Sequence, residues 1–281
     1  AKIDFIDGEK LKKFYIRNES KAQEIADRVE CSEFQIKEIN KKPVKRNPKA
    51  PFITSTMQRE AFGKFGLSAD DTMRAAQTLY EQALITYMRT DSVTMSEEGT
   101  REVRKTILSK YGEKFLSPNI RTYKTKSKQA QEGHEAIRPT NLLKYPEEIS
   151  LSTNEARLYE LIWNRAMASQ MSSAELTQTE VIIAAKDDQI TFRTTGSQVI
   201  FPGFMEVYQD SSDKKDKDKD EELLPSDIAP QDPLKKVNIN PDQHFTMPPA
   251  RFSEASLIKE LEEKGIGRPS TYASIMNSIK K

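Results

Sequence analysis

The hydrophobic period of this 281-residue chain changes at both ends of a central helical stretch, and these changes limit the possible folds more than any other feature. Short alternating runs such as KIDFI near the start, and LTQTEVIIAA and QITFRTT after residue 175, are typical of strands. Between them, apolar residues recur at helical spacing. We therefore predict a mixed α and β fold. A discontinuous β-rich domain is built from residues 1–54 and 175–245, and a helical domain over 55–174 is inserted into it.

Three Ser/Thr-x-x-Asp/Glu patterns mark helix starts inside the helical insert, at Ser68, Thr94 and Ser152. Gly112 follows the second of these helices and predicts its end. The residues of the first helix that are predicted to share one buried face are Met73, Ala76, Tyr80, Ala83 and Leu84.

A short segment, LITYMRTDS at 84–92, lies between the first two helices of the insert. Its residues 85–87 are β-formers. A tyrosine phenol can attack phosphorus and keep the bond as a phosphotyrosine, and a guanidinium can grip non-bridging phosphate oxygens. Tyr87 and Arg89 are therefore candidates for phosphoryl chemistry. The alternative is a half-buried strand tyrosine beside a solvated arginine.

Several polar residues could support this segment. Gln77 and Glu81 lie one helical turn apart, on a side of the first helix that can reach Tyr87. His134, one of two histidines, lies in GHEAIRPT, where the local alternative is a structural histidine at a helix start. In the same motif Arg138 precedes Pro139, and its alternative is a plain surface role.

The basic stretch RTYKTKSKQA at 121–130 predicts a loop that either contacts a DNA backbone or is only solvated. The Lys/Asp-rich stretch at 210–222 predicts a disordered, solvated loop rather than a metal site. FMEVYQ at 204–209 predicts a strand.

From Phe245 the helical period returns and predicts a partial helical domain over 246–281. Ser253 can cap one helix, which Gly265 and Gly267 end, and GRPSTYASI opens another. Arg268 and Thr271 then lie at a helix N-terminus, where free amides favour a phosphate. An ordinary capped helix pair is equally compatible. A non-catalytic helix-turn-helix DNA-binding module is the competing function.

The segments APFITSTMQREA, RAAQTLYEQALITYMRTDS, QEGHEAIRPT, ELIWNRAMASQM and FTMPPARFSEASLIKELEEKGIGRPSTYASI resemble the bacterial type IA DNA topoisomerases. The resemblance covers nearly the whole chain and is weakest at 1–50 and 205–240. It implies an enzyme that cleaves one DNA strand through a 5′-phosphotyrosine link, passes a strand through the break and relaxes negative supercoils without ATP. It also implies that the β-rich domain forms an arch within a ring around a DNA-sized hole.

The resemblance implies a role for each candidate residue. The catalytic residues would be Tyr87, Arg89 and His134, and the supporting residues Gln77, Glu81 and Asp91. The DNA-binding residues would be Arg89, His134, Arg138, Arg268 and Thr271.

The family uses Mg²⁺, and its acidic ligands lie in a domain that nothing in this chain matches. We therefore expect no metal bound by the chain itself, and a fragment that is inactive alone in relaxation. The family's zinc-binding cysteine repeats are absent, since Cys31 is the only cysteine. The expected partners are single-stranded and negatively supercoiled DNA and the missing domains of the same protein.

Composition restricts the partners and the location. The net charge is +1, so any electrostatic footprint for DNA has to be local. A lone cysteine fits a reducing compartment, and no apolar run approaches a membrane span. We expect a bacterial cytoplasmic, nucleoid-associated protein that does not enter a membrane.

Overall fold

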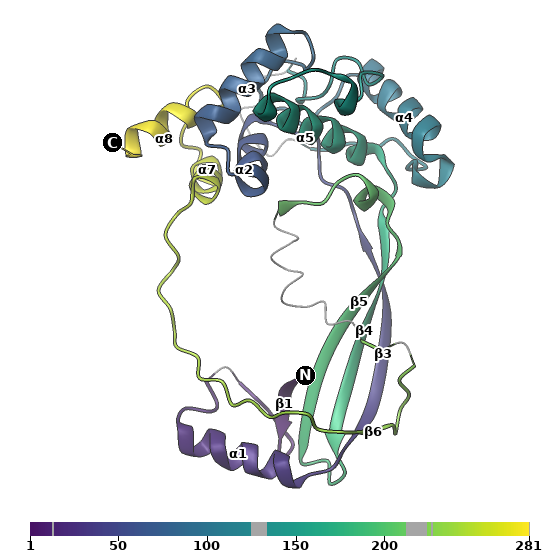
Figure 1. The fold of residues 1–281 in the computed structure, drawn as a ribbon, viewed down its shortest axis with the longest axis vertical. Coiled ribbons are helices and arrows are strands. Elements are labelled where there is room, and N and C mark those ends of the chain that lie inside the picture. The colour runs from purple at the N-terminus through teal and green to yellow at the C-terminus, as the bar shows by residue number, and fades with distance from the viewer. Residues whose placement is uncertain (13, 125–133, 212–223, 226, 281) are drawn as a thin grey trace. The chain divides into compact units, whose positions relative to one another are not determined.

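A computed structural model describes residues 1–12, 14–124, 134–211, 224–225 and 227–280 (Figure 1). The chain divides into two compact units. The β unit consists of residues 1–44, 175–200 and 216–249, and the helical unit of 45–174, 201–215 and 250–281.

The β unit contains a six-stranded sheet with the strand order β2-β1-β5-β4-β3-β6. One helix, α1 (Glu19–Cys31), belongs to the same unit, and Asn18 caps its N-terminus. The strands are β1 (Lys2–Ile6), β2 (Glu9–Lys10), β3 (Phe34–Arg46), β4 (Ala174–Ala185), β5 (Ile190–Phe201) and β6 (Pro233–Leu234).

The sheet joins strands from the two ends of the discontinuous β region. β1 pairs antiparallel with β5, with Lys2 opposite Arg193 and Ile6 opposite Ile190, so the predicted pairing is confirmed. In the turn between β4 and β5, Asp188 takes a φ of 59°, in the left-handed region. The core of this unit is formed by Ile6, Ile25, Val29, Phe34, Ala185 and Ile190. The mixed α and β fold class is thereby confirmed.

The helical unit is organised around α5 (Thr153–Gln170), which contacts the first three helices of the unit (Figure 1). Trp163, Tyr159 and Leu158 of α5 are almost fully buried, because apolar residues lie on more than one side of this helix. The other helices are α2 (Thr54–Phe65), α3 (Ala69–Glu81), α4 (Glu97–Tyr111), α7 (Glu254–Glu263) and α8 (Tyr272–Lys280), with the 3₁₀ turns η1 (Glu113–Phe115), η2 (Pro146–Glu148) and η3 (Gly203–Glu206).

The helix caps test the sequence patterns directly. Ser68 accepts a hydrogen bond from the Asp71 backbone, and the Glu155 carboxylate accepts one from the Ser152 N–H, so these two predicted starts are confirmed. The start predicted at Thr94 is wrong. Ser96 caps α4 by accepting from the Gly99 N–H, because the Thr94 carbonyl already accepts from the Ala136 N–H.

The strand predicted over 204–209 is also wrong. Pro202 and Gly203 turn the chain, with Gly203 at a φ of 52°, and the η3 turn follows. A side chain at Gly203 would meet the Ser173 carbonyl oxygen at 2.4 Å, so only glycine fits there. This turn carries Tyr208 into the interior of the helical unit.

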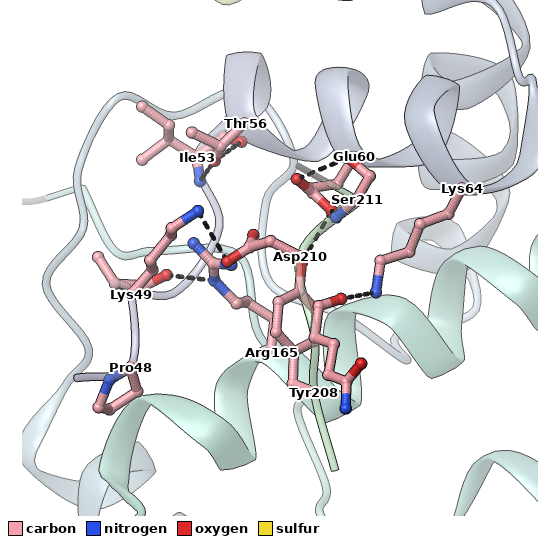
Figure 2. Close-up of polar contacts among 12 residues, drawn as sticks. Pro48, Lys49, Ile53, Thr56, Glu60, Lys64, Arg165, Tyr208, Asp210 and Ser211 are labelled. Atoms are coloured by element: carbon pink, nitrogen blue, oxygen red, sulfur yellow. Dashed lines mark hydrogen bonds and ion pairs between the residues drawn. The ribbon is translucent and has the colours of Figure 1, made fainter. Parts of the chain in front are cut away.

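The predicted start of the disordered loop over 210–222 is wrong, because Asp210 is not part of a solvated loop. Asp210 is 3% exposed and lies 2.9 Å from the Arg165 guanidinium, inside the helical unit (Figure 2). Lys49 forms a second ion pair with Asp210 at 2.8 Å. The remaining residues of that predicted loop, 212–222, lie outside the described residues.

Arg165 holds together three separate stretches of the helical unit (Figure 2). Its Nε donates to the Ala50 carbonyl oxygen at 2.6 Å, and its guanidinium lies 5.0 Å from the Phe52 ring centroid and 4.9 Å from that of Tyr208. An ion pair, a hydrogen bond and two aromatic rings thus surround this buried cation. Such a cluster stabilises only while every member is present.

Helices α7 and α8 pack against α2 and α3 and belong to the helical unit, whereas the sequence assigned residues 246–281 to a separate domain. The predicted cap at Ser253 is confirmed by its bond from the Ser256 N–H. The Glu254 carboxylate accepts from the Ala69 N–H at 2.8 Å, so α7 satisfies a free amide at the start of α3.

Candidate active site around Tyr87

The segment that carries Tyr87 is attached on one side to the 136–140 stretch. The Thr86 N–H donates to the Arg138 carbonyl oxygen at 2.9 Å, and the Thr140 N–H donates to the Leu84 carbonyl oxygen at 3.0 Å. Thr86 Oγ1 also donates to the Ala136 carbonyl oxygen. The result is an isolated bridge between Ile85 and Pro139, a shorter pairing than the strand character of 85–87 predicts.

The other side of the segment is held by one buried threonine at the start of α2. Thr54 Oγ1 donates to the Met88 carbonyl oxygen at 2.7 Å and accepts from the Thr90 N–H at 2.9 Å. The Thr54 N–H donates to the Thr90 carbonyl oxygen. Backbone groups on both sides of Tyr87 are therefore fixed by atoms from elements distant in sequence.

These anchors produce a strict alternation of burial. Met88 and Thr90 are buried, whereas Tyr87 is 46% exposed and Arg89 is exposed. Met88 between them is buried, so Tyr87 and Arg89 both emerge on the solvent side. A phenol and a guanidinium are thus presented together on a rigid backbone, a requirement for a precise reactive site.

The ring of Tyr87 packs against Tyr80, which the sequence analysis placed wrongly on the buried face of the first helix. Tyr80 is 41% exposed, and its ring meets that of Tyr87 edge to face, with centroids 5.3 Å apart. The helix ends at Glu81, and Ala83 takes a φ of 53°, so the chain turns before the predicted face is complete. Tyr80 is a site neighbour that the sequence analysis missed.

Gln77 and Glu81, predicted to support Tyr87, are hydrogen-bonded to each other at 2.7 Å. They lie on the same helix as Tyr80, α3, which ends six residues before Tyr87. Their mutual bond fixes the amide and the carboxylate beside one another at the end of that helix.

Asp91 and Arg268 both lie within electrostatic reach of Tyr272, at the start of α8. Burial raises the pKa of the Tyr272 phenol, the Glu262 and Asp91 carboxylates raise this pKa further, and Arg268 lowers it. The structure therefore brings the 84–92 segment and the GRPST turn together, although about 180 residues separate them. Within that turn Thr271 Oγ1 accepts from the Arg268 N–H at 2.8 Å, so this hydroxyl forms a local cap.

Arg138 is held within the protein rather than offered at the surface. Its guanidinium pairs with the Glu135 carboxylate at 2.7 Å and donates to Ser96 Oγ and to the Pro139 carbonyl oxygen. Burial raises the pKa of the Glu135 carboxyl, but the bonds from Arg138 and from the Ser96 backbone outweigh burial and keep that pKa below its usual value. His134, one residue before Glu135, is exposed.

Removing the Thr54 hydroxyl should disturb the Tyr87 segment. In Thr54→Val the Thr90 N–H loses its buried acceptor, and the Met88 carbonyl loses its short bond from Thr54, so we expect a loss of about 2–4 kcal/mol in unfolding free energy. Chemical denaturation measures this loss. Thr78→Val is the matched control, since the Thr78 hydroxyl bonds only to the Arg74 carbonyl within its own helix. Equal stability of the two variants would contradict the anchoring role.

Among the described residues, no group of three or more His, Cys, Asp or Glu side chains is placed to hold a metal ion. The described residues therefore do not fit a magnesium site, and no chemical step is assigned to one in this chain. Over the same described part of the chain, no helix is long and apolar enough to cross a membrane.

Comparison with known proteins identifies the family of this chain. The DNA topoisomerase family matches residues 2–281, so the chain belongs to the DNA topoisomerase family, and the resemblance to its bacterial type IA members is confirmed. DNA topoisomerase 1 of Zymomonas mobilis is 47% identical over 277 residues, which cover 97% of this chain and 22% of that protein. DNA topoisomerase 1 of Rickettsia felis is 44% identical over 289 residues, which cover 99% of this chain and 37% of that protein.

A solved structure shows the same fold. Full-length topoisomerase I of Thermotoga maritima is 34% identical and superposes with a TM-score of 0.78, covering 99% of this chain and 44% of that one. The chain thus spans less than half the length of each of these relatives.

Proposed function

We propose that this chain supplies the nucleophile of a type IA DNA topoisomerase. The phenol loses its proton as Tyr87 Oη attacks a phosphodiester phosphorus in single-stranded DNA, the bond from phosphorus to the 3′ oxygen breaks, and the departing 3′ oxygen takes up a proton and becomes a hydroxyl. The 5′ phosphate remains on Tyr87. Attack by the same 3′ hydroxyl reverses the step and releases the tyrosine. Because the phosphoester bond is conserved, the cycle needs no ATP. The exposed, doubly anchored position of Tyr87 is the observation that carries the proposal.

Arg89 is proposed to stabilise the charge on phosphorus during attack. It emerges on the same side as Tyr87, and the structure records no hydrogen bond or ion pair for its side chain among the described residues. A guanidinium matches two phosphate oxygens at once, and such donors are most effective in the transition state.

The remaining candidates are proposed to contact or orient the strand. His134 is exposed, and Arg268 and Thr271 lie at the α8 start beside Asp91, which favours contacts with phosphates flanking the cleaved bond. The bonds of Arg138 favour a positioning role for this residue over direct phosphate contact. Gln77, Glu81 and Asp91 are proposed to orient the cations.

The complete protein is proposed to use Mg²⁺ whose ligands lie in parts of the relatives that this chain does not span. Its partners would then be single-stranded and negatively supercoiled DNA, and those further parts of the same protein. A cytoplasmic, nucleoid-associated location belongs to the same proposal.

A non-catalytic DNA-binding module is the second candidate, favoured by the α7–α8 pair and its short glycine-containing turn. A binder cannot form a covalent bond to DNA, so covalent trapping separates the two functions.

An exchange protein tests the proposed activity. In it, this chain replaces the matching 277-residue segment of the Zymomonas mobilis enzyme. With magnesium, it should relax negatively supercoiled plasmid, whereas the 281-residue chain alone should not, because strand passage needs the further domains. Tyr87→Phe is the control. Relaxation by the chain alone that depends on Tyr87 would contradict this division of labour between the domains.

A further inference from the structure

A pocket of about 580 Å³ opens in the helical unit beyond the Tyr87 segment, and none of the roles proposed above uses it. This volume lies within the usual range of small-ligand sites, about 300–1,000 Å³. The residues that form its wall come from 93–104, from 120–123, and from Pro51 and Gln170.

Part of the pocket wall is cationic. Arg101 and Arg104 of α4 line it together with Arg121, and Glu97 is the one acidic residue among these described lining residues. Glu97 and Arg101 are one helical turn apart, yet no ion pair between them is present among the described residues. Arg104 makes one long bond, 3.3 Å, to the Asn119 carbonyl oxygen. The guanidinium groups of Arg101 and Arg104 therefore have N–H donors available to bind an anion.

Arg121 is different, because its donors are already used. Its Nε donates to the Met171 carbonyl oxygen and its Nη2 to Ser173 Oγ, both at 2.8 Å. Gln170 clamps the Arg121 backbone with two hydrogen bonds, to its N–H and its carbonyl oxygen. These bonds shape the pocket wall and leave Arg121 as a fixed positive charge.

Another part of the pocket wall is apolar and aromatic. Ile120 is 61% exposed although it is a large aliphatic side chain, and Val93, Met95 and Tyr123 line the same pocket. The Tyr123 hydroxyl donates to the Ser169 carbonyl oxygen at 2.8 Å, which anchors the ring. An anchored ring and an exposed aliphatic side chain in the same pocket provide a surface on which a nucleobase can stack.

Position along the chain links the pocket to the reactive tyrosine. Val93 follows Tyr87 by six residues, and six extended residues span at most about 20 Å. Thr94, also in the wall, bonds through its carbonyl oxygen to the Ala136 N–H, next to the His134 motif. A DNA strand bound at Tyr87 would therefore reach this pocket within a few nucleotides.

We propose that this pocket binds one nucleotide of single-stranded DNA. Its phosphate would lie on Arg101 and Arg104, and its base on Ile120 and Tyr123. The assignment to a DNA strand rests on the proposed function, whereas the recognition of a nucleoside monophosphate does not. The pocket would thus hold a strand away from the reaction centre and extend the site beyond the phosphates at Tyr87.

The test uses the 281-residue chain with Tyr87→Phe and without magnesium, so that binding is separated from cleavage. Amide NMR signals are followed during titration with inorganic phosphate, with thymidine monophosphate and with a short oligodeoxythymidine. We expect shifts at Val93, Thr94, Arg101 and Ile120 with all three probes, and tighter binding of the nucleotide than of phosphate. No shift at these residues with the nucleotide would overturn the proposal.

Two double variants then distinguish a specific binding site from a general effect of positive charge. Arg101→Gln/Arg104→Gln should weaken mononucleotide and oligonucleotide binding about tenfold or more. The control Lys105→Gln/Lys114→Gln removes the same charge from residues outside the pocket wall and should change mononucleotide binding less than about twofold. Equal weakening by both pairs would refute a specific pocket.

A last variant tests the side chains that are proposed to contact the nucleobase. Ile120→Ser should weaken binding of the nucleotide and leave phosphate binding unchanged, and equal effects on both would refute stacking. If the mononucleotide binds but the oligonucleotide does not reach the pocket, the link to a DNA strand is wrong. Failure of covalent cleavage alone leaves these binding results untouched, so the two proposals fail separately.

Discussion

Replacing Arg89 with alanine in the exchange protein should lower the rate of DNA strand cleavage about a hundredfold or more, while the thermal unfolding of the chain stays unchanged. Arg89 is exposed on the solvent side of the segment together with Tyr87, so its loss removes no packing. Losing one donor that stabilises a developing charge commonly costs about a hundredfold to a thousandfold in rate.

Arg89→Lys separates charge from geometry. Lysine keeps the positive charge but not the planar fork, so partial recovery of cleavage would indicate a charge effect, and none would indicate bidentate contact. Quenched single-turnover cleavage of a labelled oligonucleotide measures the rate. Cleavage by Arg89→Ala at the wild-type rate would remove Arg89 from the mechanism.

The largest effect on stability is expected at the buried ion pair of the helical unit. Asp210→Ala leaves the Arg165 guanidinium without its charge partner in the interior, and breaking such a pair typically costs about 3–5 kcal/mol. Glu260→Ala is the control, because it breaks the exposed pair with Lys264 and should cost less than about 1 kcal/mol. Denaturant unfolding of both variants measures the difference. A loss below about 1 kcal/mol for Asp210→Ala would contradict the role of the cluster.

The lowered pKa of the Asp210 carboxyl predicts that the stability of the fold depends on pH. Burial raises the pKa of the Asp210 carboxyl, but the charges of Arg165 and Lys49 outweigh burial and hold this pKa below its ordinary value. A carboxyl whose folded pKa is depressed stabilises the fold above its unfolded pKa, near 4, and this stabilisation is lost as the pH falls through the folded pKa. Below about pH 4 the free energy of unfolding should therefore fall more steeply in wild type than in Asp210→Asn.

Local patterns predicted local structure well. The caps at Ser68, Ser152 and Ser253 depend on bonds within four residues, so the sequence contains all that determines them. At Thr94 the same pattern failed because a distant partner, Ala136, takes its carbonyl oxygen. The strand pairing of β1 with β5 was predictable from hydrophobic period.

The sequence proposed the reactive residues of the candidate site but did not indicate what holds them in place. Tyr87 and Arg89 were singled out by their chemistry together with the resemblance to type IA topoisomerases. Thr54 reaches Met88 and Thr90 across about 35 residues, and Asp210 reaches Arg165 across 45, contacts that no local pattern marks. One signal existed for Thr54: a hydroxyl at the first position of a helix, where free backbone groups collect.

The central claim is that Tyr87 becomes covalently joined to DNA, and mass spectrometry of the trapped complex tests it most directly. The exchange protein is incubated with a single-stranded oligonucleotide, denatured, and digested with protease and nuclease. The account predicts a peptide that contains Tyr87 with a 5′-phosphorylated nucleotide remnant on its phenol oxygen, absent from Tyr87→Phe. A remnant on another residue, or one that persists in Tyr87→Phe, would contradict it.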